Sequence, residues 1–283
     1  MWTNFHTHTD FCDGKGELST FVSQAIELNM RGIGFSSHAP LPFGCAWCMK
    51  ENSLPAYLAE IETLRLAHPE IEIYAGLEVD YIPGVVSPQQ FRQRLDYVIG
   101  SIHFVEGFYN GAHWEIDGPY LNFLQGLDVI FHNNIRDAIT RYFEITREMV
   151  RTARPEIVGH LDKIKIQNIH GKHFSEAEPW YRQEVLKTID VIQKEEVIVE
   201  VNTRGIYQRK SSTTYPSPWI LEILHQRNIP ITINSDAHHP SDLINHFSET
   251  AKVLQQIGFK KLTSFHEGSW QPFAYDTHGL MTS

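Results

Sequence analysis

The stretch ITINSDAH, at residues 231–238, contains the pattern that decides the fold of this chain. Its apolar run at 231–233 ends shortly before Asp236 and His238, two side chains suited to binding a metal ion. Side chains two positions apart in an extended chain point to the same face, so this carboxylate and this imidazole should lie side by side. The stretch therefore predicts a buried strand whose carboxyl end carries part of a metal site.

Six further apolar runs end close to side chains suited to binding a metal ion or a phosphate. The runs and the residues that follow them are 2–5 with His6 and His8, 33–35 with His38, 71–77 with Glu78, 97–102 with His103, 157–159 with His160, and 197–201 with Asn202 and Arg204. Amphipathic segments lie between the runs, at 17–29, 54–66, 136–152, 184–192, 218–224 and 241–257. Strands that alternate with helices form a parallel sheet, and in a closed sheet their carboxyl ends meet at one mouth. We therefore predict an α/β barrel with one site built from many strand ends.

The length and the charge of the chain limit its class. At 283 residues it can bury one large core, and no linker interrupts the alternation, so we predict a single domain over 1–283. The 24 basic and 34 acidic side chains give a net charge of −10, which argues against a nucleic-acid partner. The chain enters a strand at once and has no run near the roughly 20 apolar residues of a membrane span. We expect no membrane partner and a cytoplasmic location, and three cysteines are too few for a disulfide scaffold.

One segment, at about 104–134, departs from the alternation of strands and helices. It follows the strand that ends at His103, and glycines and Pro119 interrupt it. This position predicts a loop or a small subdomain at the mouth of the barrel. Two interpretations stay open, an element that covers the substrate and a packed surface excursion.

The Cys45-Ala-Trp-Cys48 motif has the spacing of some zinc and redox sites. The sequence contains no second cysteine pair to complete a zinc site. We therefore interpret the motif as part of a packed loop after His38, near the substrate pocket.

Seven short motifs occur at the ends of the predicted strands or close behind them. They are His6-Thr-His8, Asp13-Gly14, Ser37-His38-Ala39, Gly76-Leu-Glu78, Gly100-Ser-Ile-His103, Gly159-His160-Leu-Asp162 and Ser235-Asp236-Ala237-His238. In this order they resemble the PHP (polymerase and histidinol phosphatase) family, and the whole chain is similar to its monofunctional histidinol-phosphatase branch. The resemblance covers residues 2 to about 260, and the ordered set is more specific than any one motif. It implies a distorted (β/α)7 barrel with a metal site at the C-terminal ends of the strands.

The resemblance also implies three divalent metal ions. Carried over residue by residue, the first ion takes His6, His8, Glu78 and Asp236, the second takes Glu78, His103 and His160, and the third takes Asp13, His38 and His238. Mixed imidazole and carboxylate donors suit zinc, manganese or iron. The absence of a thiolate from this set argues against a purely structural zinc site.

The activity that the resemblance implies is hydrolysis of a small phosphate monoester, L-histidinol phosphate, in histidine biosynthesis. The chemistry of the donors leads to the same reaction, because two ions that share Glu78 can hold a bridging hydroxide while a third offsets the phosphoryl charge. We predict Glu78, Asp236 and Arg204 as catalytic residues. The sequence leaves open whether Asp236 or a metal-bound water protonates the leaving alkoxide.

Basic side chains should complete the phosphate site. Arg204 follows a buried strand and suits bidentate binding of a phosphate. Lys165 occupies a position where the resembled enzymes typically carry a basic residue, and it is the second predicted substrate-binding residue. Lys163 is its close competitor and is expected to be a solvated surface charge, as are Arg209 and Lys210.

The sequence fits three rival functions less well. Another PHP-family phosphoesterase would act on a nucleotide or other small phosphate ester, although the acidic balance disfavours a nucleic-acid substrate. A non-catalytic metal-binding PHP barrel is disfavoured because the ligand set is complete and Arg204 is present. An amidohydrolase-type enzyme is disfavoured because no barrel lysine is placed to bridge two ions.

Overall fold

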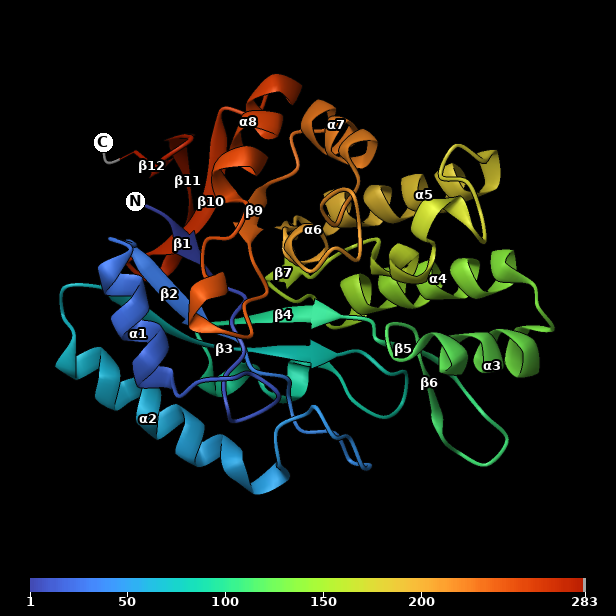
Figure 1. The fold of residues 1–283 in the computed structure, drawn as a ribbon, viewed down its shortest axis with the longest axis horizontal. Coiled ribbons are helices and arrows are strands. Elements are labelled where there is room, and N and C mark those ends of the chain that lie inside the picture. Colours follow the sequence, from blue (N-terminus) through green and yellow to red (C-terminus); the bar gives the residue numbers. More distant parts are fainter. Residues whose placement is uncertain (282–283) are drawn as a thin grey trace.

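Seven parallel strands form the centre of the computed structural model, which describes residues 1–281 (Figure 1). Their order in the sheet is β1-β2-β3-β4-β7-β8-β9, so strands that follow one another in this series also lie side by side. Their bounds are β1 (Thr3–Asn4), β2 (Gly32–Phe35), β3 (Glu72–Asp80), β4 (Tyr97–Ser101), β7 (Ile157–Val158), β8 (Ile198–Asn202) and β9 (Ile231–Asn234). Each of the seven apolar runs forms one of these strands, which confirms the predicted (β/α)7 barrel.

The barrel closes between its first and its last strand. Beyond β1 and β9 the two segments stay side by side, and Thr7 forms a parallel bridge with Ala237. The His8 amide donates to the Ala237 carbonyl at 2.8 Å, and the Ala237 amide donates to the His6 carbonyl at 3.0 Å. Closure therefore brings the histidines after the first strand next to the segment that follows the last one.

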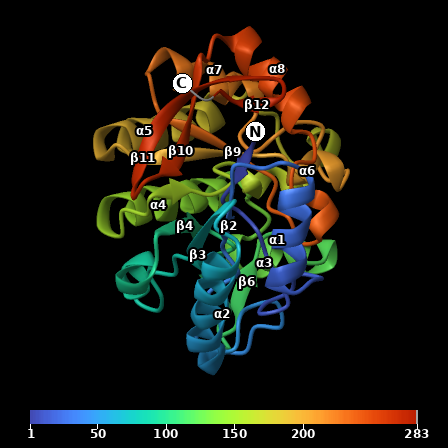
Figure 2. The same cartoon turned by 90° about the vertical axis from the view of Figure 1, so that its left-hand side faces the viewer.

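Helices cover the outside of the barrel in both views (Figure 1 and Figure 2). They are α1 (Leu18–Glu27), α2 (Leu54–Ala67), α4 (Ile135–Thr152), α5 (Pro179–Glu195), α7 (Pro218–Gln226) and α8 (Phe247–Ile257). The connections also contain the short helix α6 (Arg204–Tyr207) and the 3₁₀ helices η1 (Glu51–Ser53), η2 (Pro88–Gln90), η3 (Arg92–Arg94), η4 (Lys163–Gln167), η5 (Ile169–Gly171) and η6 (Pro240–Asp242). Each of the six amphipathic segments of the sequence overlaps an α-helix, although α5 begins five residues before the predicted segment at 184–192. Within residues 1–281, no helix is long and apolar enough to cross a membrane.

A three-stranded antiparallel sheet covers the amino ends of the barrel strands. Its strands are β10 (Lys261–His266), β11 (Ser269–Asp276) and β12 (Gly279–Leu280). Phe265 of β10 packs in one cluster with Phe5 and with Tyr97, the first residue of β4, and Trp270 of β11 packs against this cluster. The Trp270 and Phe5 ring centroids lie 5.0 Å apart. This sheet lies beyond residue 260, where the family resemblance ends, and the sequence analysis did not predict it.

The segment at 104–134, predicted as a loop or a small subdomain at the mouth, contains regular secondary structure. It contains a hairpin of β5 (Phe104–Gly107) and β6 (His113–Glu115), followed by α3 (Tyr120–Phe131). Trp114 is buried against Gly126 of α3. A Cβ atom at position 126 would lie only 2.0 Å from the Trp114 indole ring, so this packing requires glycine. The Ile116 amide donates to the His103 carbonyl at 2.9 Å. This bond holds the end of the hairpin over the carboxyl end of β4.

Candidate metal centre

The nine predicted metal ligands lie together at the carboxyl ends of the barrel strands. They form overlapping groups in which the ligand atoms lie within 4.8 Å of one another. The groups are His8, Asp13, His38 and His238; His6, His8 and Asp236; and His38, Glu78 and His103. The ninth residue, His160, places its Nε2 atom 2.8 Å from Glu78 Oε1. The structure therefore brings all nine side chains into one centre.

Glu78 occupies the middle of this centre. Its carboxylate is buried, and the Ser101 hydroxyl donates to Oε1 at 2.6 Å. Its oxygens lie near five imidazoles, at 3.2 Å from His6 Nε2, 3.4 Å from His8 Nε2, 2.9 Å from His38 Nδ1, 3.7 Å from His103 Nε2 and 2.8 Å from His160 Nε2. A carboxylate surrounded in this way is suited to bridge two metal ions.

The outer part of the centre is built by the segment after β9. Asp236 has a φ of 52°, a left-handed conformation that aspartate tolerates better than most residues. Its Oδ1 atom lies 3.2 Å from His8 Nε2. Two positions later, His238 places Nε2 at 3.3 Å from Asp13 Oδ1, and His38 Nε2 lies 3.9 Å from the same oxygen. The candidate metal ligands therefore form a continuous series from the barrel interior to its mouth.

Several of the atoms that could bind a metal ion are buried without a hydrogen-bond partner. Among residues 1–281 they include His6 Nε2, His8 Nε2, Asp13 Oδ1 and His38 Nδ1. Buried polar atoms in folded proteins are nearly always paired, so this cluster of unpaired atoms calls for a further binding partner. Imidazole and carboxylate donors without thiolates suit divalent zinc, manganese or iron. The side chains present therefore fit a divalent-metal centre.

The charges in the centre depend on one another. Burial alone lowers the pKa of His6, but the carboxylates of Glu200, Asp236 and Glu78 raise it well above its usual value. Burial alone raises the pKa of Glu78 and of Asp236, but the surrounding imidazoles, and for Asp236 also Arg204, hold both well below the usual range. Both carboxylates are therefore ionised, as metal ligands must be.

Glu200 is a buried functional residue that the sequence analysis missed. It lies in β8 and accepts hydrogen bonds from His6 Nδ1 at 2.6 Å and from the His160 amide at 2.7 Å. The side-chain amides of Asn202 and Asn234 each donate to it at 3.0 Å. A carboxylate on one imidazole nitrogen fixes the ring so that the other nitrogen faces the metal. The available signal was a charged residue inside the apolar run at 197–201.

Asp80 has the same relation to His103. Its Oδ1 atom accepts from His103 Nδ1 at 3.0 Å and from the His103 amide at 2.9 Å. Burial alone lowers the pKa of His103, but the charge of Asp80 raises it to about 9. Asp80 lies two positions after Glu78 in β3, so the two side chains share a face of the strand. That spacing was the signal in the sequence.

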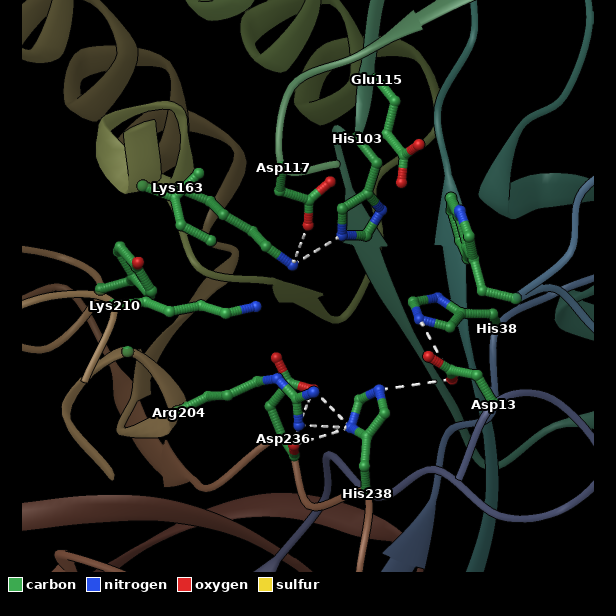
Figure 3. A pocket seen from close by; sticks show the side chains of 14 residues that line it. Asp13, His38, His103, Glu115, Asp117, Lys163, Arg204, Lys210, Asp236 and His238 are labelled. Carbon is green, nitrogen blue, oxygen red and sulfur yellow. Dashed lines mark hydrogen bonds and ion pairs between the residues drawn. The ribbon is translucent and has the colours of Figure 1, made fainter. Parts of the chain in front are cut away.

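Arg204 lines the pocket above the donors (Figure 3). It begins α6, directly behind the carboxyl end of β8. Its Nη1 atom donates to the Asp236 carbonyl at 2.7 Å and lies 2.6 Å from His238 Nδ1. The guanidinium is thus anchored at the edge of the centre, with part of its surface open to the pocket.

The two lysines after His160 lie in different surroundings. Lys163 was predicted as a surface charge, and this prediction is wrong: the side chain is buried and its amine donates to Asp117 Oδ2 at 2.9 Å. The Lys165 amine instead donates to Asp162 Oδ2 at 2.8 Å, and Lys165 lines a neighbouring cavity rather than the pocket of the donors. Both lysines lie in η4, where each residue turns the chain by roughly 120°, so positions 163 and 165 point to different sides.

Cys45 and Cys48 form a disulfide, which the sequence analysis did not predict. The loop that they close places Trp47 in the wall of the pocket, with its ring centroid 4.5 Å from that of His38. The predicted location near the pocket is therefore confirmed.

The fold and the centre together define a metal-dependent enzyme built on a seven-stranded barrel. The family model of the PHP domain matches residues 4–204. This chain belongs to the PHP domain family.

Three known proteins are similar to the chain over most of its length. It is 27% identical over 271 residues to the probable histidinol-phosphatase of Deinococcus radiodurans, covering 92% of this chain and 95% of that protein. It is 23% identical to the histidinol-phosphatase of Bacillus subtilis, covering 84% and 94% of the two proteins. The crystal structure of histidinol phosphate phosphatase from Lactococcus lactis, complexed with zinc, L-histidinol and phosphate, matches with a TM-score of 0.72 at 21% identity, covering 95% and 98% of the two chains. This last likeness shows a common fold.

Proposed function

We propose that this chain, a metal-dependent phosphatase of the histidinol-phosphatase type, hydrolyses L-histidinol phosphate to L-histidinol and phosphate. The names of its relatives in Deinococcus and Bacillus support this substrate. The donor set and the charges of the pocket support it independently of those names.

In this proposal the nine clustered ligands hold three divalent ions of zinc, manganese or iron. His6, His8, Glu78 and Asp236 hold the first ion, Glu78, His103 and His160 the second, and Asp13, His38 and His238 the third. When bound, the ions supply an activated water as nucleophile and offset the charge on the phosphoryl oxygens. Glu200 and Asp80 hold the imidazoles of His6 and His103 in the orientation that metal binding needs.

Arg204 is assigned to the phosphate. Its guanidinium lies within 4.0 Å of Asp236 Oδ1 and lines the pocket, so a phosphoryl group beside the donors is within its reach. Guanidinium binds phosphate through two parallel hydrogen bonds and stays charged at any pH at which the protein is folded. Burial alone lowers the pKa of Arg204, but Asp236 raises it above its usual value.

The observation that carries the proposal is a cation and a carboxylate, Arg204 and Glu115, that line the pocket at two separate places. The two side chains lie on different sides of this pocket (Figure 3). Within residues 1–281, Glu115 forms no ion pair, whereas its neighbours Glu106 and Asp117 each pair with a basic side chain. L-Histidinol phosphate carries an ammonium group as well as a phosphate, so its two charged ends match the two sides of the pocket.

The subdomain at 104–134 then has a defined role. It supplies Glu115 and Asp117 to the pocket, and Asp117 holds Lys163 beside His103. We assign it to covering the substrate, as a part of the single domain that spans 1–283. The mouth segment thereby distinguishes substrates while the strand ends perform the chemistry.

The test compares two substrates on the metal-loaded protein. L-Histidinol phosphate carries the ammonium group and p-nitrophenyl phosphate does not. Glu115→Gln should lower kcat/KM for histidinol phosphate by about tenfold or more, the value of a charge-assisted hydrogen bond, and should leave p-nitrophenyl phosphate unaffected.

Glu106→Gln is the matched control, because Glu106 lies in the same hairpin and pairs with Arg141 outside the pocket. It should leave kcat/KM unchanged for both substrates. Equal losses on both substrates in Glu115→Gln, or a wild-type protein without preference for histidinol phosphate, would reject this substrate.

A further inference from the structure

Lys210 is a cation that the sequence analysis set aside as a surface charge. Its side chain is exposed but lines the pocket of the donors together with Arg204 and Lys163. Figure 3 shows the three cationic groups pointing into the same space. The proposed function so far makes no use of this lysine.

The chain between Arg204 and Lys210 is a tightly built turn. The amides of Lys210 and Ser211 both donate to the Gly205 carbonyl at 2.9 Å. A Cβ on Gly205 would lie 2.8 Å from the Tyr215 ring and 2.9 Å from Ser211 Cβ, so a larger residue would displace the turn. The turn therefore holds Arg204 and Lys210 as a pair at one side of the pocket.

The three cations differ in what neutralises them. Lys163 pairs with Asp117 Oδ2 at 2.9 Å, and Arg204 pairs with Asp236 Oδ1 at 4.0 Å. Among the residues that the structure describes, Lys210 forms no ion pair and its amine makes no hydrogen bond. Burial, Arg204 and Lys163 lower the pKa of Lys210, whereas the more weakly acting carboxylates of Asp117 and Asp236 raise it.

We propose that Lys210 is a further phosphate-binding residue, which contacts the phosphoryl oxygens of the substrate and of the phosphate product from the mouth side of the pocket. Like charges that converge on an open space are stabilised when an anion occupies it. A flexible lysine acts there as a point charge, whereas Arg204 provides a fixed fork. The assignment rests on the proposed function in one respect, namely that a phosphate monoester binds beside the donors.

The test measures phosphate binding as well as turnover. The protein is loaded with Zn²⁺, the Kd of inorganic phosphate is measured by calorimetry, and kcat and KM are measured with p-nitrophenyl phosphate. Lys210→Gln should raise the phosphate Kd and the KM together by about tenfold, within the range of a charge-assisted contact, and leave kcat nearly unchanged. Lys210→Arg should restore most of both values, which a merely structural role would not predict.

Arg209→Gln is the matched control, because Arg209 is the adjacent cation and lines the neighbouring cavity instead. Its phosphate Kd and KM should equal those of the wild type. An unchanged phosphate Kd in Lys210→Gln, or an equal change in Arg209→Gln, would overturn the assignment. Zinc content and the unfolding temperature of each variant show whether weaker phosphate binding comes from misfolding. If Lys210→Gln misfolds, the phosphate Kd of Lys210→Arg tests the assignment, and it should be close to that of the wild type.

The two proposals can fail separately. Phosphate binding that Lys210→Gln weakens, in a protein that does not hydrolyse histidinol phosphate, upholds Lys210 and rejects the proposed substrate. If the protein hydrolyses histidinol phosphate but Lys210→Gln leaves the phosphate Kd unchanged, the proposed substrate is upheld and the role of Lys210 is rejected. Absence of phosphate binding by the wild-type protein would overturn both.

Discussion

The two ends of the barrel are built from opposite chemistry. At the amino ends of the strands, aromatic and aliphatic side chains such as Phe5, Tyr97 and Phe265 pack together under the C-terminal sheet. At the carboxyl ends, buried imidazoles and carboxylates crowd together, and several of their atoms lack a hydrogen-bond partner. Apolar burial stabilises a fold, whereas unpaired buried polar groups destabilise it. The comparison teaches that one end supports the stability needed to hold the other end ready for metal ions.

The largest effect that this comparison predicts is at Glu78. Glu78→Gln removes the charge at the middle of the centre, so kcat/KM should fall by more than about 100-fold, the upper range seen for groups that only support metal ligands. Kinetics and elemental analysis of the purified variant test this. His113→Ala, in the hairpin at the mouth, is the control and should retain nearly full activity. Comparable losses in the two variants would mean that the centre lies elsewhere.

A smaller loss is expected at Arg204, which contacts the proposed phosphate but is not among the proposed ligands. Arg204→Ala should lower kcat/KM by about 10- to 100-fold, and Arg204→Lys should lower it less, because lysine cannot form the bidentate contact. Metal content should not change in either variant. Wild-type kinetics in Arg204→Ala, or loss of metal together with activity, would remove Arg204 from the phosphate site.

The smallest effect on activity is expected at the amino ends of the barrel strands, under the C-terminal sheet. Phe265→Ala should lower the free energy of unfolding by about 3 kcal/mol, because a buried phenyl ring is lost from the cluster with Phe5 and Tyr97. The kcat/KM value at 25 °C should stay within twofold of the wild type. Chemical denaturation and steady-state kinetics measure the two quantities. A large loss of activity without a loss of stability would show that the two ends are not independent.

The sequence predicted the strands and the placement of their ligands because both are local patterns. A short apolar run followed by histidine or a carboxylate indicates a strand end without knowledge of the rest of the fold. Glu200 and Asp80 escaped notice because a charged residue within or just beyond an apolar run shows its role only when its partner, His6 or His103, lies opposite.

Other features depend on tertiary contacts or on weak turn signals. The orientations of Lys163 and Lys165 follow from how η4 packs on the barrel, which their spacing does not show. The α3 helix contains Gly126, which disfavours a helix locally but is required by the packing of Trp114. The hairpin of β10 and β11 turns at Glu267 and Gly268, with φ values of 49° and 78°. Asn-Gly or Asp-Gly would have marked such a turn, and Glu-Gly does not.

The central claim is that the strand ends form a divalent-metal centre that hydrolyses a phosphate monoester. The most direct measurement is a titration of the metal-free protein with Zn²⁺ or Mn²⁺, in which bound metal and phosphate release from L-histidinol phosphate are followed together. We predict no phosphate release from the metal-free protein, and activity that rises with bound metal to a plateau near three ions per chain. Full activity in protein confirmed as metal-free by elemental analysis would contradict the account.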